Sequence, residues 1–300
     1  VIADRPIAWY MGDDNRFDYF YKFVSDENWD PADADGGLTA GNKYLDNGTL
    51  YVARFFEDGS GEWVELDISV PALAARFSSQ AEVLTYARIA ADLVNATPMD
   101  RPEWSSTDPN TGEIYLTLTN NTRREVGDEN PANPRANNSH GHVIRLAEAG
   151  DNPAATTFDW DIFVFGSNAS ADPSFNISGL TLDNEFASPD GLWFDKRGVL
   201  WIQTDNGAPL DSNTNDQMLA VVPAGLDGDR LIRPDTQAQL KRFFVGPVGC
   251  EVTGVDMTPD NRTMFVNIQH PGGTFPDGAG TRPRSATVVI SRTDGGEIAL

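Results

Sequence analysis

The chain contains 300 residues, with 22 Lys and Arg residues against 45 Asp and Glu residues, so its net charge is −23. This length suits one large all-β domain. The acidic excess argues against nucleic acid or an anionic membrane as a partner, because both attract basic surfaces. No apolar run is long enough to span a membrane, and the single cysteine, Cys250, can form no disulfide within the chain.

Short runs of β-branched and aromatic residues, bounded by Gly, Pro, Asn and Asp, predict strands along most of the chain. The expected strands are Ile7–Met11, Tyr19–Val24, Thr49–Phe56, Gly61–Asp67, Ile114–Thr119, His142–Leu146, Phe158–Val164, Gly191–Phe194, Leu200–Gln203, Met218–Val222, Lys241–Val245, Gly254–Met257, Met264–Ile268 and Ala286–Arg292. This pattern predicts an all-β fold, a β-propeller of three or four four-stranded blades. Because closed propellers usually have about four to eight blades, the ring is expected to be incomplete.

One helix is expected near residues 80–95. Ser79 and Glu82 have the spacing of a capping box, and Val83, Ala87 and Ala90 then follow the helical period. This helix would deliver the chain to residues 99–103. No second boundary is visible, so residues 1–300 are predicted to form a single propeller region.

Three segments of the chain begin alike, each with a carboxylate ahead of a strand, a turn and a second strand. The carboxylates are Glu103, Asp190 and Glu251. Repetition around an axis would point all three at one place. Converging carboxylates repel one another and need protons or cations between them, and calcium in particular takes oxygen ligands. The repeat therefore predicts a metal site, although Asp190 could instead cap a turn between Pro189 and Gly191.

Two further motifs offer charged side chains. Gly12-Asp13-Asp14 follows the first strand, and either carboxylate could face a cation, although the motif is also an ordinary turn signal. In Arg101-Pro102-Glu103 an extended backbone would place the arginine and the glutamate on the same face. An arginine beside a metal-binding glutamate can hold a phosphate through two hydrogen bonds, and a local ion pair is the alternative.

Two strand exits correspond in the repeat, Thr204-Asp205-Asn206-Gly207 and Asn267–Gly272. They offer oxygen ligands or substrate contacts, and hairpin turns explain them equally well. Cys250 is expected to be a small buried hydrophobe rather than a nucleophile, because no nearby histidine would activate it.

In these segments the chain resembles the PhoX family of alkaline phosphatases. The matches come in family order and cover nearly the whole chain, which makes them far more specific together than singly. They are Tyr10–Asp14, Tyr21–Ser25, Met99–Trp104, Asn130–Asn138, Ser188–Asp195, Gly249–Gly254, Phe265–Gly272 and Arg282–Val289.

The resemblance implies a monomeric propeller that hydrolyses small-molecule phosphate monoesters with ferric iron and calcium ions in its central channel. It also implies export, and hence a periplasmic or secreted location. Carried over to this sequence, it implies that Glu103, Asp190, Glu251 and an aspartate of the Gly-Asp-Asp motif, Asp14 before Asp13, are metal ligands. It further implies that Arg101 binds the substrate phosphate and acts in catalysis together with Glu103.

The chain also departs from the family. The amino-terminal half, which holds the family's iron-ligating cysteine, has no match, and Cys250 is not its equivalent. We therefore expect a fragment of a longer PhoX-like phosphatase that carries only some of the ligands.

Two alternative functions remain at this stage. One is a calcium-dependent lactonase or esterase propeller, which shares the patterns Pro189–Leu192 and Leu200–Ile202 but leaves Arg101 and Glu103 unexplained. The other is a non-catalytic binding propeller stabilised by calcium.

Overall fold

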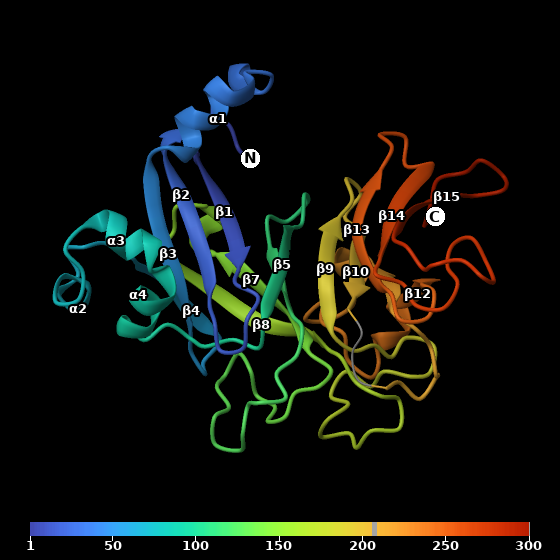
Figure 1. Cartoon of the computed structure of the whole chain (residues 1–300). Coiled ribbons are helices and arrows are strands. Elements are labelled where there is room, and N and C mark those ends of the chain that lie inside the picture. Colours follow the sequence, from blue (N-terminus) through green and yellow to red (C-terminus); the bar gives the residue numbers. More distant parts are fainter. Residues whose placement is uncertain (206–208, 300) are drawn as a thin grey trace.

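A computed structural model describes residues 1–205 and 209–299. Eight strands form one sheet in the order β1-β2-β3-β4-β8-β7-β6-β5. Their bounds are β1 Pro6–Gly12, β2 Phe20–Asn28, β3 Gly48–Phe55, β4 Ser60–Glu65, β5 Pro102–Thr107, β6 Ile114–Leu118, β7 His142–Glu148 and β8 Thr157–Phe165. Each four-strand meander is antiparallel, and the two meanders join where β4 pairs with β8. Since Ser105 Oγ of β5 also donates to Tyr10 O of β1 at 3.0 Å, the sheet nearly closes on itself (Figure 1).

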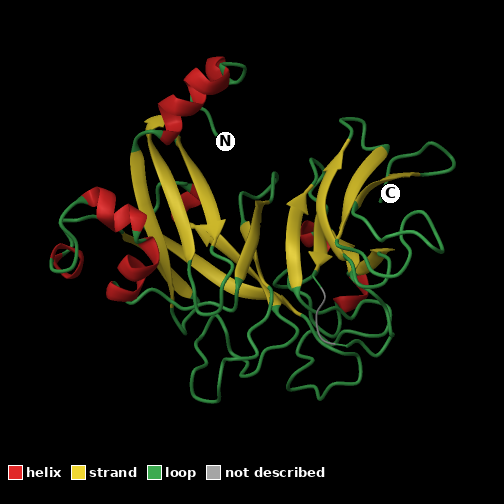
Figure 2. Ribbon diagram, viewed as in Figure 1, coloured by secondary structure: helices red, strands yellow, loops and turns green. Residues whose placement is uncertain are grey.

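Two smaller antiparallel sheets follow in the chain. One has the order β12-β11-β10-β9, with β9 Pro189–Phe194, β10 Leu200–Thr204, β11 Gln217–Val221 and β12 Lys241–Val245. The other has the order β13-β14-β15, with β13 Glu251–Met257, β14 Thr263–Gln269 and β15 Ala286–Ser291. Strand β9 contacts both β5 and β13, and we call β5, β9 and β13 the inner strands. Long loops gather at one end of the sheets (Figure 2).

The sheets pack face to face through apolar side chains, as propeller blades do. Strand β6 shows this most clearly, because all five of its residues are buried. Its Leu116 lies in the apolar interior of the eight-stranded sheet with Phe20 and Trp63. Its Tyr115 packs against Phe194 of β9, with ring centroids 5.1 Å apart. A continuous apolar run therefore reflects burial on both faces of the strand.

Within the described residues, four α-helices lie outside the sheets: α1 Gly37–Leu45, α2 Pro71–Ala74, α3 Gln80–Thr85 and α4 Ala87–Leu93. Helices α2 to α4 cover the outer face of the first meander (Figure 1). The expected single helix is broken at Tyr86, whose φ and ψ are −110° and 43°. Ser79 caps α3 as expected, accepting from the Glu82 N–H at 3.3 Å, but Glu82 accepts from the Ser78 N–H and not from that of Ser79.

The all-β, propeller-like prediction is confirmed, and each expected strand is present within a few residues of its predicted bounds. Two corrections follow. The first two meanders share one sheet and are not separate four-stranded blades. Helix α1 was not expected. The strand that the repeat implied at Glu103, without stated bounds, is β5, which pairs with β6. In the described part of the chain, no helix has the length and apolarity to cross a membrane.

Candidate metal centre

The inner strands begin with the same backbone turn. Arg101, Ser188 and Gly249 have φ values of 56°, 51° and 70°, and each stands two residues before the carboxylate of its strand. This left-handed conformation costs energy for residues other than glycine and persists only where the surroundings enforce it. The carbonyl of Arg101 accepts from the Thr119 N–H at 3.1 Å, and that of Ser188 accepts from the Asp205 N–H at 3.0 Å. The sequence repeat is thus a repeat of backbone geometry.

The first two inner strands also share a bulge at the carboxylate. In β5, Pro102 pairs with Leu118 and Ser105 with Leu116, so Glu103 and Trp104 both face Thr117. In β9, Asp190 and Gly191 both face Gln203 in the same way. The third inner strand, β13, carries its irregularity later, between Thr253 and Val255. Bulges re-aim side chains and are frequent beside functional sites.

Arg101, Asp14 and Glu103 form one cluster at the start of β5. The Arg101 guanidinium donates to Asp14 from Nε at 2.7 Å and from Nη2 at 2.9 Å, and its Nη2 lies 3.5 Å from Glu103 Oε1. Burial, a hydrogen bond with Asp14 and the charge of Asp190 raise the pKa of Glu103 to about 9. Burial opposes ionisation of Asp14, yet hydrogen bonds with Arg101 and Glu103 hold the pKa of Asp14 below its usual value.

Asp190 and Glu251 extend the cluster along the inner strands. Burial, followed by the charges of Glu251, Asp205 and Asp14, raises the pKa of Asp190 to about 7. Burial and the charge of Asp205 raise the pKa of Glu251, which also accepts from Gln269 Nε2 at 2.6 Å. These carboxyls are close enough to oppose one another's ionisation, which is the behaviour expected of ligands arranged for a cation.

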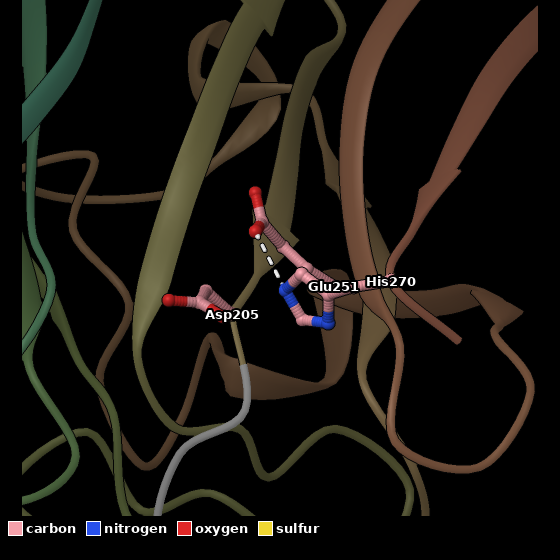
Figure 3. A group of neighbouring side chains, drawn as sticks. All are labelled: Asp205, Glu251 and His270. Carbon is pink, nitrogen blue, oxygen red and sulfur yellow. Dashed lines mark ion pairs between the residues drawn. The ribbon is translucent and has the colours of Figure 1, made fainter. Parts of the chain in front are cut away.

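Figure 3 shows Asp205 and His270 beside Glu251, at the exits of β10 and β14. Ligand atoms of the three residues lie within 4.8 Å of one another, and His270 Nε2 is 3.4 Å from Glu251 Oε2. The corresponding strand exits in the sequence pointed to these two side chains, but the predicted ligand set did not include them. Asn206 and Gly207 of that motif lie outside the described residues.

Asp13 turns away from the cluster toward the inserted helices. Its carboxylate pairs with the guanidinium of Arg88 in α4, and Arg88 is 56% exposed. The Gly-Asp-Asp motif alone did not decide which aspartate faces a cation, and the resemblance put Asp14 before Asp13. The contacts place Asp14, not Asp13, with Arg101 and Glu103.

The donor set suits a hard cation, because it consists of carboxylate oxygens with one imidazole. Cys250 does not belong to it. Cys250 is buried in an apolar cluster, and burial raises the pKa of its thiol to about 12. Cys250 is therefore the buried hydrophobe that the sequence predicted.

The fold is a propeller-like arrangement of β-sheets. An arginine and several carboxylates meet at the ends of its strands, so the class of protein is a β-propeller-like protein with a candidate metal centre. The model of the family described as alkaline phosphatase PhoX matches residues 1–272. The chain belongs to the PhoX family of alkaline phosphatases.

A solved structure, Pseudomonas fluorescens PhoX in complex with vanadate, a transition state analogue, is 41% identical to this chain with a TM-score of 0.86. The match covers 98% of this chain and 52% of that protein, so the chain spans about half the length of this relative. No curated protein matches the chain.

Proposed function

We propose that this chain supplies metal ligands and the phosphate-binding arginine of a metal-dependent phosphate monoester hydrolase. One observation carries the proposal: Arg101 stands among carboxyls that oppose one another's ionisation, in a family of alkaline phosphatases. Vanadate bound to the Pseudomonas relative supports the same chemistry, because pentavalent vanadium adopts the five-coordinate geometry of phosphoryl transfer.

In this proposal calcium and ferric ions are held by five carboxylates, those of Asp14, Glu103, Asp190, Glu251 and Asp205. When bound, the cations supply positive charge that neutralises phosphate oxygens and activates water near neutral pH. Arg101 orients the phosphate, since a guanidinium can donate two parallel hydrogen bonds to it, and stabilises the charge that develops on its oxygens. Glu103, at the bulge of β5, lies beside Arg101, so a cation held by Glu103 would be next to a phosphate held by Arg101.

The finer expectations belong to the same proposal. Residues 1–300 form one propeller-like unit of a longer phosphatase, in which further residues complete the ligand set. The substrates are small phosphate monoesters, and the protein is a monomer that works in the periplasm or outside the cell. The acidic charge of −23 fits a calcium-rich, oxygen-liganded protein of this kind.

Hydrolysis of p-nitrophenyl phosphate tests the proposal. The chain is assayed with calcium and iron supplied, before and after a chelator, and the same assay follows on a longer protein that contains it. We expect chelator-sensitive turnover. Turnover of lactones without phosphatase activity, or calcium-dependent melting with no ester turnover in the longer protein, would contradict it.

A further inference from the structure

Thr117 of β6 faces the bulge that carries Glu103 and Trp104. Its side chain is fully buried, and its Oγ1 lies 3.1 Å from Trp104 O and 2.7 Å from Asp190 O. A bulge disrupts the ladder locally, and a buried carbonyl requires a hydrogen-bond donor. The Thr117 hydroxyl is thus within hydrogen-bond distance of two carbonyl oxygens. One belongs to Trp104, which follows Glu103 in β5, and the other to Asp190 in β9.

The next blade repeats this arrangement. Gln203 of β10 faces the bulge at Asp190 and Gly191, and its Nε2 lies 3.4 Å from Gly254 O of β13. Gly191 leaves the space for it, because a Cβ at position 191 would lie 2.4 Å from Gln203 Oε1. In both blades, therefore, the polar side chain opposite the bulge reaches the next inner strand.

We propose that Thr117 is a positioning residue, whose hydroxyl fixes the separation of the Glu103 and Asp190 carboxylates. This inference rests on the proposed function, in which both carboxylates hold a cation. Without the hydroxyl, two neighbouring carbonyl oxygens lose their shared donor and repel each other, so β5 and β9 separate at their bulges. Calcium ligands must lie about 2.3–2.6 Å from the ion, and such a separation weakens binding.

Calorimetric titration with calcium alone tests the inference on the wild type, Thr117→Val and Thr117→Ser. Thr117→Val keeps the shape of the side chain but removes the hydroxyl, and we expect its calcium Kd to rise roughly tenfold or more. Thr117→Ser keeps the hydroxyl and should retain most of the wild-type affinity. If Thr117→Val does not fold, Thr117→Cys replaces it with the same expectation, since a thiol donates only weakly.

Thr236→Val is the matched control. It removes a hydroxyl that donates to Leu231 O at 2.7 Å, outside the carboxylate cluster, and should lower the Tm without changing the calcium Kd. An unchanged Kd in Thr117→Val, or an equal rise in Thr236→Val, would overturn the inference. If the wild-type chain alone binds no calcium, the same variants are compared in a longer protein that contains it. Absence of calcium binding in that longer wild-type protein would instead overturn the proposed function, so the two failures are distinguishable.

Discussion

Arg101 binds the Asp14 carboxylate through two hydrogen bonds of 2.7 and 2.9 Å, joining the turn after β1 to the start of β5. In the proposed function Asp14 is a metal ligand and Arg101 binds the phosphate. A cation bound at Asp14 would then compete with the guanidinium for the same carboxylate, and a guanidinium released by that competition would be free to donate to a phosphate.

The first prediction concerns Arg101→Met. We expect binding of inorganic phosphate, measured calorimetrically in calcium, to weaken about 10–100-fold, the equivalent of roughly 1.5–3 kcal/mol for hydrogen bonds to a charged group. The affinity for calcium should not fall, because Asp14 is released. Arg54→Met, which breaks a distant pair with Glu62 of 2.7 Å, is the control. A parallel loss of calcium and phosphate binding would refute this division of roles.

The second prediction separates the two aspartates that follow β1. Asp14→Asn should raise the calcium Kd at least about tenfold, because Asp14 lies in the carboxylate cluster. Asp13→Asn loses an ion pair with Arg88, which is 56% exposed, and should leave the calcium Kd unchanged. Calorimetric titration of both variants decides the matter, and the reverse order of affinities would assign the ligand to Asp13.

The third prediction uses the free energy of unfolding of Glu103→Gln, measured in urea. In chelator the variant should be more stable than the wild type by roughly 1–3 kcal/mol, because it removes a carboxyl whose pKa is raised to about 9 by burial first and by Asp14 and Asp190 second. In calcium the order should reverse, since the wild type binds calcium more tightly and gains more ligand-linked stability than the variant.

Glu148→Gln serves as the control for this comparison. Glu148 is a buried carboxyl paired with Lys22 at 2.9 Å, so its loss should destabilise the protein in both buffers. If Glu103→Gln kept the full calcium stabilisation, Glu103 would not be a ligand.

The fourth prediction concerns His142, which is fully buried between Asn138 and the carbonyl of Ala132. Burial and the charge of Arg135 lower the pKa of His142 from 6.5 to about 4. Between these values the unfolded chain binds a proton that the folded chain does not, so stability falls as the pH drops from 6.5 to 4. The loss reaches about 3 kcal/mol.

Urea unfolding in chelator at several pH values measures this loss. His142→Gln should show a smaller loss over the same range, and His140, whose burial also lowers its pKa, accounts for part of what remains. An identical pH dependence in His142→Gln would contradict the assignment.

The sequence by itself determined the strands and the repeat. Short runs of β-branched and aromatic residues located most strands, because such side chains pack well on a pleated, buried surface and turn residues bound each run. The spacing of Glu103, Asp190 and Glu251 was also sufficient to predict that they converge, since equivalent positions in equivalent blades face the same axis. Asp205 and His270 were visible as corresponding strand exits, although not as members of the cluster.

Only the tertiary structure decided how these groups meet. Strand β5 pairs with β6, and its Ser105 reaches Tyr10 of β1, where the eight-stranded sheet nearly closes. The choice between Asp14 and Asp13 depends on Arg101 and Arg88, each more than 70 positions away, at separations of 87 and 75. Likewise, Thr117 reaches Asp190 across 73 positions. Such distant partners cannot be predicted from local sequence, because register and bulges are set by the strands that pack together.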